Sequence, residues 1–471
     1  FSVTFEGVNN AINLANDYPI PDSEGLEREP YTFKVTNNCN QYLTLSIGVE
    51  TLSTSEIPSN LIKGVIVNNG GTPTNAMLLS SGKTMEAQNG GTAYELLTDG
   101  LDAKASKTYD LRLWFDESMT KEQGASKKYQ GKVIVGATTE VESPKNLREA
   151  ILANNEVKTP ITTPGAAVST ADEALLASAE DDNGTSYYFR GTVINNYVEF
   201  ANKCWRIVRV GGDGSVKLIL HNDNTTKAAN PCDSANNSAS AAFARYSGET
   251  YKSAFNTNYN DNAYVGFKYG TAGASDYATT HANTNNSTIL TNLETWYTNN
   301  LKTYADTIAD TVWCNDKTNV TDTTYDPWGW NPNGLGYAKN VTYYGATQRL
   351  VSTSNSAGGT GPSLKCNGEL NKITSKVGLI TADELAFAGY ATGLQNTTTY
   401  LQENATDTYW WSLSPYYFRG VNAGVWYVGG CDGLFDGNSV DTALGVRPSI
   451  SLKSTTNVTG SGTSEAPFKV V

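Results

Sequence analysis

Short segments in which apolar and polar side chains alternate fill the first 138 residues of this chain, with turn residues between them. One of these segments carries Leu111, Leu113 and Phe115 at every second position. A strand with one buried face has this period of two, and several such strands at regular spacing are typical of a β-sandwich. Residues 1–138 are therefore predicted to form an all-β sandwich of the jelly-roll or immunoglobulin-like kind.

The first of these strands begins at the N-terminus, where Phe1, Val3 and Phe5 alternate with Ser, Thr and Glu. Two interpretations of this strand stay open. It is either an ordinary strand of its own domain, which the pattern alone favours, or a donor strand, residues 1–8, that completes the sheet of a neighbouring subunit.

The composition changes after residue 138. Residues 143–155 have the apolar spacing of a short amphipathic helix, and a tract rich in Thr, Pro, Gly, Ala and Ser follows them. Such tracts behave as extended linkers, so residues 139–185 are predicted to be a short helix and a linker. Residues 186–471 are predicted to form one large α+β domain, with strands at both ends and helices near residues 288–309.

The net charge of −13 argues against a nucleic-acid partner, because phosphate binding needs a concentrated positive field. A chain of 471 residues exceeds the size of one ordinary core, so two or three domains are expected. No stretch is long and apolar enough to cross a bilayer, and Asn, Thr, Ser, Gly and Tyr are abundant. These features predict a secreted protein at the cell surface, with its signal peptide already removed.

None of the six cysteines has the Cys-x-x-Cys spacing of a zinc ribbon or a thioredoxin-like site. Widely spaced cysteines in a secreted chain more often form disulfides. The predicted pairs are Cys204 with Cys232 and Cys314 with Cys366, which leaves Cys39 and Cys431 unpaired.

Candidate catalytic groups are few. His221 and His281 are the only histidines, and both lie in loop-like segments that favour exposed, structural roles. No nucleophile elbow, phosphate-binding loop or dinucleotide fingerprint is present. Neighbouring carboxylates rarely face each other as the acid and base of a glycosidase do, so solvated surface charge is the better interpretation of Asp181–Asp182 and Asp383–Glu384. The sequence predicts no catalytic residue.

Two Asx-rich loops offer oxygen ligands for calcium. Asp223 lies in HNDNTT and Asp261 in YNDNAY, and neither loop has the full spacing of an EF-hand. Asx-rich turns more often cap backbone amides. No metal or cofactor is therefore predicted, and calcium is kept as the alternative.

Aromatic residues are dense near the C-terminus. Trp411 and Trp426 lie in apolar strand runs and are predicted to be core residues. Rigid aromatic side chains and arginine among small, adaptable residues have instead the chemistry of a binding surface. The predicted ligand-binding face, between Pro415 and Gly445, comprises Tyr417, Phe418, Arg419, Tyr427, Phe435, Asp436, Asn438 and Asp441.

Three segments of the first domain match a known group. PYTFKVTNNCNQYLTLSIGVE follows the N-terminal strand, and TYDLRLWFDE and YQGKVIVGA come later. With these segments the domain, about a quarter of the chain, resembles the camelysin/TasA group of biofilm-fibre and spore-surface proteins. Subunits of that group can polymerise by donating an N-terminal strand, so the resemblance favours the donor interpretation of residues 1–8.

A second resemblance covers most of residues 184–471. It lies in GTSYYFRGTVINNYVEFANKCWRIVRVGGDGSVKLI, KVGLITADELAFAGY, YWWSLSPYYF and GVRPSISLK. These segments resemble an extracellular module of Gram-positive-type bacteria whose C-terminal half is similar to the C-type-lectin-like fold of formylglycine-generating enzymes and of retroelement-diversified variable proteins. Enzymatic activity is not carried over, because only Cys431 lies where those enzymes use a cysteine pair. The resemblance implies a C-type-lectin-like binding domain, with a face that is hypothesised to be diversified.

These observations predict a non-catalytic subunit of an extracellular, pilus-like fibre. Identical subunits would assemble through donor strands and display an adhesive domain to a glycan or protein ligand. A monomeric surface adhesin and an enzyme acting on polysaccharide are the alternatives.

Overall fold

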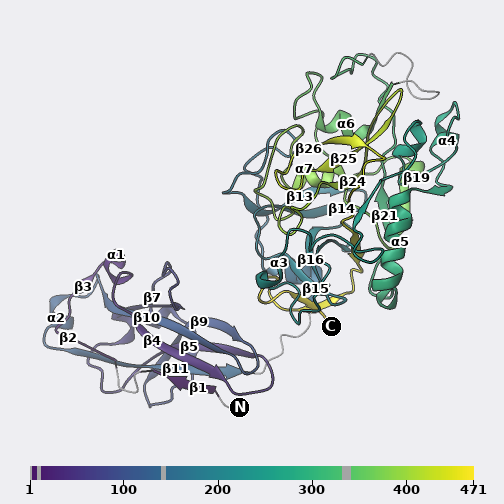
Figure 1. The fold of residues 1–471 in the computed structure, drawn as a ribbon. Helices are drawn as coiled ribbons and strands as arrows, with labels where there is room; N and C mark the ends of the chain where they lie inside the picture. Colours follow the sequence, from purple (N-terminus) through teal and green to yellow (C-terminus); the bar gives the residue numbers. More distant parts are fainter. Residues whose placement is uncertain (1–2, 8–11, 139–144, 331–340) are drawn as a thin grey trace. The chain divides into compact units, whose positions relative to one another are not determined.

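A computed structural model describes residues 3–7, 12–138, 145–330 and 341–471 (Figure 1). The chain divides into two compact units, Phe1–Ser143 (unit 1) and Pro144–Val471 (unit 2). The fold is mostly β-sheet, with 38% of residues in strands and 14% in helices. Among the described residues, no helix has both the length and the apolar character that a membrane crossing needs.

Unit 1 consists of two sheets that contribute to one hydrophobic core. Alternation places Phe33 and Val35 of the first sheet and Leu45 and Ile47 of the second in that core. The first sheet has the order β1-β4-β10-β6-β7, with β3 paired to β10: β1 (Val3–Glu6), β3 (Pro19–Ile20), β4 (Tyr31–Asn37), β6 (Ile62–Asn68), β7 (Met77–Leu78) and β10 (Ser106–Asp116). The second has the order β2-β11-β5-β9-β8: β2 (Ile12–Ala15), β5 (Leu43–Thr51), β8 (Thr84–Met85), β9 (Thr92–Leu101) and β11 (Lys128–Thr138). The short helices are α1 (Asp22–Gly25) and α2 (Lys121–Gly124).

Strand β1 is the described part of the predicted donor strand, and it pairs within unit 1. It runs antiparallel to β4, with Thr4 opposite Thr36, at the edge of the sheet. Val3 and Phe5 are half-buried and pack against the core. The rest of the predicted segment, including Phe1, lies outside the described residues. Within the described residues, β1 is therefore an edge strand of its own sheet.

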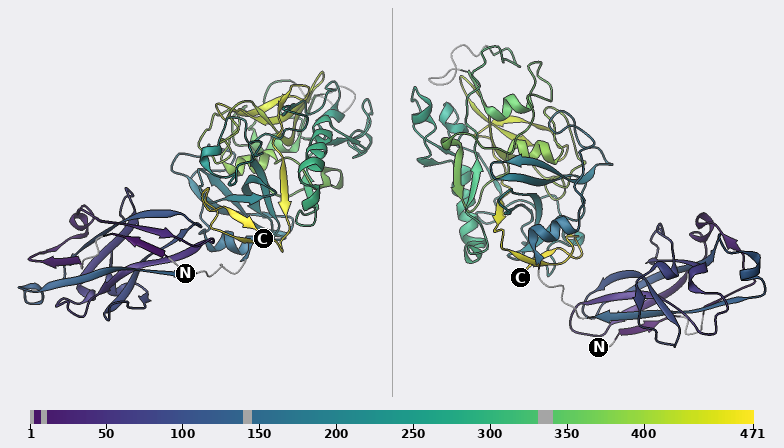
Figure 2. Two further views of the ribbon diagram at one scale, coloured as in Figure 1. Left: turned by 60° about the horizontal axis from the view of Figure 1, so that its bottom comes forward. Right: turned by 180° about the vertical axis from the view of Figure 1, so that it is seen from behind.

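Unit 2 is built on two larger sheets that contribute to one core (Figures 1 and 2). The larger sheet has the order β12-β29-β30-β15-β16-β14-β13, and β17 pairs with β16 and β28: β12 (Lys145–Asn146), β13 (Ala174–Asp181), β14 (Gly184–Gly191), β15 (Tyr197–Phe200), β16 (Lys203–Val210), β17 (Val216–Asn222), β28 (Ser449–Leu452), β29 (Asn457–Thr459) and β30 (Phe468–Val470). The second has the order β18-β27-β24-β25-β26, with β22 paired to β24: β18 (Lys252–Ser253), β22 (Val341–Tyr343), β24 (Trp410–Arg419), β25 (Ala423–Val428), β26 (Phe435–Ser439) and β27 (Leu444–Gly445).

Two small ladders and five α-helices complete the part of unit 2 that the structure describes. The ladders join β19 (Lys268–Tyr269) to β20 (Asn285–Asn286) and β21 (Thr311–Cys314) to β23 (Lys372–Ser375). The longest helix, α5 (Thr288–Asn300), lies in the predicted helical region, and the Ser287 side chain caps it by accepting from the backbone N–H of Leu290. The other helices are α3 (Leu147–Ala153), α4 (Tyr277–Thr280), α6 (Gly345–Leu350) and α7 (Ala382–Ala388).

The segment predicted as a linker belongs to unit 2. The short helix is present as α3, which buries Leu147 and Ile151. In the tract after it, the Glu173 carboxylate lies 2.9 Å from the guanidinium of Arg190 on β14, and both side chains are fully buried. The chain enters β13 directly afterwards, at Ala174. The structure thus differs from the linker prediction, because a buried ion pair and a strand fix a tract whose composition indicated flexibility.

Both predicted disulfides are present. They join Cys204 to Cys232 and Cys314 to Cys366, with Cα atoms 5.0 and 5.6 Å apart. Disulfides form and persist in oxidising compartments. The two bonds and the β-rich fold therefore fit a secreted, extracellular protein.

Candidate functional site

The aromatic members of the predicted ligand-binding face lie on paired strands, and they are buried. Phe418 and Phe435 are fully buried, and Tyr417 and Tyr427 are less than one-tenth exposed. The four aromatic members of the predicted face are therefore largely closed to a ligand, and Phe418 and Phe435 in particular lie inside the core.

Glycines on two of these strands accommodate aromatic rings. A side chain at Gly437 on β26 would collide with the ring of Tyr416, and a Cβ at Gly424 on β25 would lie 2.8 Å from the ring of Tyr417. The glycines therefore make room for tyrosine rings of β24 and do not mark turns.

The polar members of the predicted face are more accessible. Arg419 and Asp441 are exposed, and Asp436 and Asn438 are half-buried. The Asp441 carboxylate accepts a hydrogen bond from Ser439 at 2.6 Å, within its own turn. Arg419 and Asp436 instead adjoin a group of aromatic rings that includes Tyr417 of the predicted face and two tryptophans outside it.

That group contains two tryptophans at the surface of unit 2. Of the nine tryptophans in the chain, seven are fully buried, whereas Trp328 and Trp330 are half-buried. Their rings stack with centroids 5.0 Å apart. Rigid rings with one buried and one open side are typical anchors of binding sites. The two tryptophans that are not buried therefore lie together, in a position to contact a ligand.

Three tyrosines form a floor beneath the two indoles. Trp328 lies 5.4 Å from Tyr343 and 5.3 Å from Tyr416, and Trp330 lies 5.2 Å from Tyr417, between ring centroids. All three tyrosines are buried. Antiparallel pairing of β22 with β24 places Tyr343 opposite Tyr417. The sheet therefore fixes the rings on which the indoles rest.

Two carboxylates orient this floor. The hydroxyl of Tyr343 donates to Asp326 and that of Tyr416 donates to Asp436, both at 2.8 Å. Burial, reinforced by these carboxylates, raises the pKa of both phenols, so both stay protonated and keep donating. Asp326 also accepts from the backbone N–H of Trp330 at 2.8 Å, which fixes the turn that carries the indoles.

Arg419 places a cation beside the rings. Its guanidinium carbon lies 5.7 Å from the centroid of Trp330 and 6.0 Å from that of Tyr417, within cation–π range. Its Nε donates to Asn422 at 2.8 Å, which leaves other N–H donors of this exposed residue for a ligand. The tryptophan site is defined here as Trp328, Trp330, Tyr343, Tyr416, Tyr417 and Arg419.

A signal for the missed tryptophans was present in the sequence. They lie in DPWGW, where proline and glycine favour a turn, and Gly329 has a positive φ of 68°. Turns run over the surface, so aromatic residues within one have no strand to bury them. A Trp-Gly-Trp turn therefore predicts exposed indoles.

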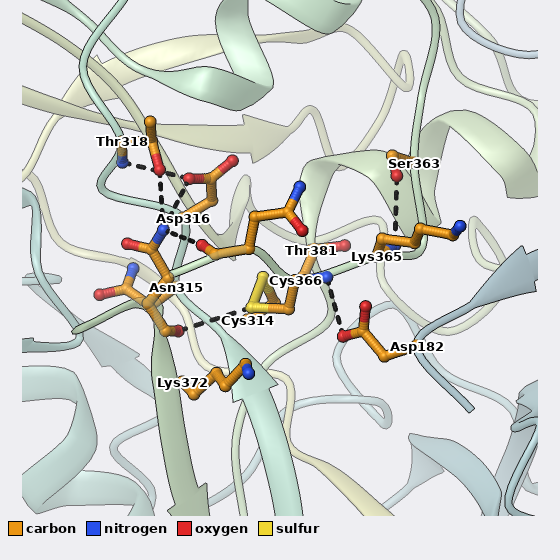
Figure 3. Close-up of a disulfide and its surroundings, with 12 residues drawn as sticks. Asp182, Cys314, Asn315, Asp316, Thr318, Ser363, Lys365, Cys366, Lys372 and Thr381 are labelled. Carbon is orange, nitrogen blue, oxygen red and sulfur yellow. Dashed lines mark hydrogen bonds between the residues drawn. A yellow bond between two sulfur atoms is a disulfide. The ribbon is translucent and has the colours of Figure 1, made fainter. Parts of the chain in front are cut away.

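A concave site lies beside the Cys314–Cys366 disulfide, whose surroundings Figure 3 shows. It is a small cavity of about 90 Å³. Paired charges line it, with the shortest N···O distances between 2.6 and 3.0 Å: Arg209 with Asp181 and Glu384, Lys217 with Glu384, and Arg349 with Asp316 and Asp383.

The interpretation of the neighbouring carboxylates as solvated charge is wrong for three of the four. Asp181, Asp383 and Glu384 are buried within this network. Asp182 is exposed and accepts a hydrogen bond from the backbone N–H of Cys366 at 3.0 Å (Figure 3). Buried carboxylates need such cationic partners, because an unpaired charge away from water is costly.

The electrostatics of this cavity favour a structural role. Burial alone would raise the pKa of Glu384, but Lys217 and Arg209 outweigh it and lower the pKa to about 2. A glycosidase acid needs the opposite shift, since it must hold a proton near neutral pH. Glu384 is therefore a permanent anion that holds two cations.

The remaining sequence candidates are also fixed within the fold. His221 and His281 are fully buried and not exposed as predicted, and burial lowers the pKa of both. Asp223 pairs with Lys203 at 2.7 Å, and Asp261 accepts from the backbone N–H of Ala263 at 2.9 Å. Over the described ranges, no group of three or more His, Cys, Asp or Glu residues could hold a metal ion.

Known proteins offer no further guide to this site. No protein-family model matches the sequence, and no curated protein or solved structure matches it significantly.

Proposed function

We propose that unit 2 is the ligand-binding part of an extracellular adhesive protein and that the tryptophan site contacts the ligand. The exposure of Trp328 and Trp330, in a chain that buries its seven other tryptophans, carries this proposal. Burying an exposed indole against a ligand removes a large apolar area from water, and a buried tyrosine floor holds both rings ready at little entropic cost.

The chemistry of the site fits a glycan or a protein surface. Stacked indoles offer flat apolar faces to a sugar ring or to an apolar side chain. Arg419 and the half-buried Asp436 add a cation and an anion at the margin, where hydrogen bonds select orientation. The combination of apolar centre and polar rim is typical of a recognition site.

Binding of the full-length protein to a glycan array and to isolated Gram-positive cell walls tests this proposal. Replacing Trp328 and Trp330 together by alanine is expected to weaken binding at least tenfold. Tyr18→Ala, at an exposed tyrosine of unit 1, is the matched control and leaves binding unchanged. Ligand binding that survives the double substitution at full strength overturns the proposal.

We further propose that unit 1 links identical subunits into a fibre by exchanging β1. This strand has four residues, contacts β4 at the sheet edge, and inserts only two half-buried side chains, Val3 and Phe5. A short edge strand with few core contacts costs little to remove, and the vacated edge of β4 accepts an equivalent strand from another copy. The C-terminal unit would then be displayed along the fibre.

A pair of introduced cysteines separates exchange from pairing within one chain. Thr4→Cys with Thr36→Cys places thiols at directly opposed positions, in a background where Cys39 and Cys431 are replaced by serine. Strand exchange predicts a ladder of disulfide-linked oligomers on a non-reducing gel. A monomer with an internal disulfide, together with fibres that persist after deletion of residues 1–8, contradicts it.

A further inference from the structure

Lys317 is fully buried, and neutral oxygens surround its amine. Its Nζ donates to the backbone carbonyls of Lys268 and His281 at 3.2 and 3.1 Å. The third hydrogen bond, to Oδ1 of Asn283, is the shortest at 2.7 Å. The amine therefore lies against a side-chain amide, in a place that solvent does not reach.

Two other buried lysines show how unusual this arrangement is. Lys203 and Lys217 pair with carboxylates at 2.7 and 2.6 Å, whereas Lys317 forms no ion pair with the residues that the structure describes. Burial without a counter-charge lowers the pKa of Lys317 from 10.5 to about 7. A large share of the amine is then neutral at neutral pH, with a free electron pair, and a neutral amine is a nucleophile.

The amide of Asn283 is held in a fixed orientation. Its Nδ2 donates to the backbone carbonyl of Leu370 at 3.1 Å, which leaves Oδ1 facing Lys317. Asn283 itself is half-buried, so a small molecule released from its amide has access to solvent. Because the amine and the amide are already held in contact, their reaction avoids the entropic cost of bringing two separate reactants together.

We propose that Lys317 and Asn283 join in an intramolecular isopeptide bond. Nζ of Lys317 attacks the amide carbon of Asn283, so that an N–C bond forms and the bond from that carbon to Nδ2 breaks. One hydrogen moves from Nζ to Nδ2, and ammonia leaves. The exchange of one amide for another needs no oxidant, reductant or cofactor.

The surroundings favour keeping such a bond. The ring of His281, whose carbonyl holds the amine, packs edge-on against Tyr277 and Tyr344, with centroids 5.1 and 6.1 Å apart. An aromatic environment excludes the water that hydrolysis needs. The bond would close a loop of 34 residues and fasten the turn before β20 to the segment after β21.

Intact mass spectrometry of the purified full-length protein tests the proposal. The expected mass is that of the sequence with two disulfides, less one ammonia. A protease digest is expected to yield one branched peptide that joins the segments around Asn283 and Lys317. A mass without this loss, or two separate unmodified peptides, overturns the proposal, and neither measurement depends on a variant that folds.

Variants locate the bond. Lys317→Arg and Asn283→Ala are each expected to restore the full sequence mass. Asn285→Ala is the matched control, since this exposed asparagine lies two residues further along, at the start of β20, and its Nδ2 donates to the carbonyl of Gly270 at 2.8 Å. The control keeps the loss of ammonia. Persistence of the loss in Asn283→Ala assigns it to another amide and refutes the proposed bond.

Discussion

Oε1 of Glu384 lies 2.6 Å from Nζ of Lys217, although 167 positions separate the two residues in the sequence. Arg209 donates to the same oxygen at 2.8 Å and also pairs with Asp181. Glu384 has a second task, because its other oxygen accepts from the backbone N–H of Thr381 in a capping box that begins α7. One carboxylate therefore links the start of a helix to two strands of the larger sheet.

Glu384→Gln is expected to lower the free energy of unfolding of unit 2 by about 3–5 kcal/mol, since it leaves two buried cations short of an anion. Urea denaturation followed by tryptophan fluorescence measures this, because eight of the nine tryptophans lie in unit 2. Glu369→Gln is the control. It removes an exposed pair with Lys372, and no measurable change is expected. Equal effects of the two substitutions would contradict a stabilising network.

The stability of unit 2 is expected to fall as the pH drops from 6.5 to 5. Burial lowers the pKa of His281 to about 3, and burial also lowers that of His221. Below pH 6.5 these histidines bind protons in the unfolded chain but stay neutral in the folded chain. The stability that is present above pH 6.5 is therefore progressively lost. For His281 the loss is about 2 kcal/mol at pH 5, and His221 adds a loss in the same direction.

His281→Gln separates this effect from other titrations, since glutamine does not titrate. Urea denaturation at pH 7 and pH 5 is expected to show a pH-dependent loss about 2 kcal/mol smaller than that of the unsubstituted protein. Carboxylates with lowered pKa values, such as Glu384, reduce stability mainly below pH 4.5 and do not affect this window. An unchanged loss in the variant shows that His281 does not carry it.

Trp328 and Trp330 are expected to account for the tryptophan fluorescence that acrylamide quenches in the folded protein. Replacing both by phenylalanine should remove most of the quenching and shift the remaining emission to shorter wavelength, because the other seven indoles are buried. Trp426→Phe, at a core position, is the control and leaves the quenched fraction intact. Substantial quenching in the double variant would show that the site is closed.

A thiol reagent is expected to modify Cys431 in the folded protein before it reaches Cys39. Both cysteines are free, but Cys431 is exposed and Cys39 is only partly so. Unfolding without a reductant should raise the count to two thiols per chain, since the other four cysteines form disulfides. Cys431→Ser removes the fast phase. More than two reactive thiols would indicate that a disulfide is absent.

Local patterns in the sequence predicted part of the fold. Alternation identified strands such as β10, and its Leu111 and Leu113 are buried. The helical period at α5 and the wide spacing of the cysteines also led to correct predictions. These features succeed because each depends on residues close in sequence or on a single chemical preference.

The failures involve contacts between distant residues. Nothing near Glu173 in the sequence indicates that Arg190 will lie beside it, so the tract around Glu173 was predicted to be a linker. In the same way, no local pattern places Lys217 beside Glu384, so Glu384 was predicted to be a surface charge. Gly437 accommodates the ring of Tyr416, a residue of another strand that no pattern around Gly437 indicates. Predictions made from composition and local pattern were therefore wrong about the burial of these charges and of the aromatic face.

The pairing of strands in the larger sheet of unit 2 sets the order in which the chain acquires structure. β17 pairs with β28, and β15 runs parallel to β30. These strands near residues 200–220 can therefore complete their pairing only after residues 449–470 have been synthesised. As the chain emerges from the ribosome, unit 1 has all its described strands while β15 and β17 of unit 2 each still lack one neighbour. Such long-range pairing slows folding. A truncation that ends the chain just after β27 would thus take β28, β29 and β30 from the larger sheet of unit 2, although unit 1 would be intact.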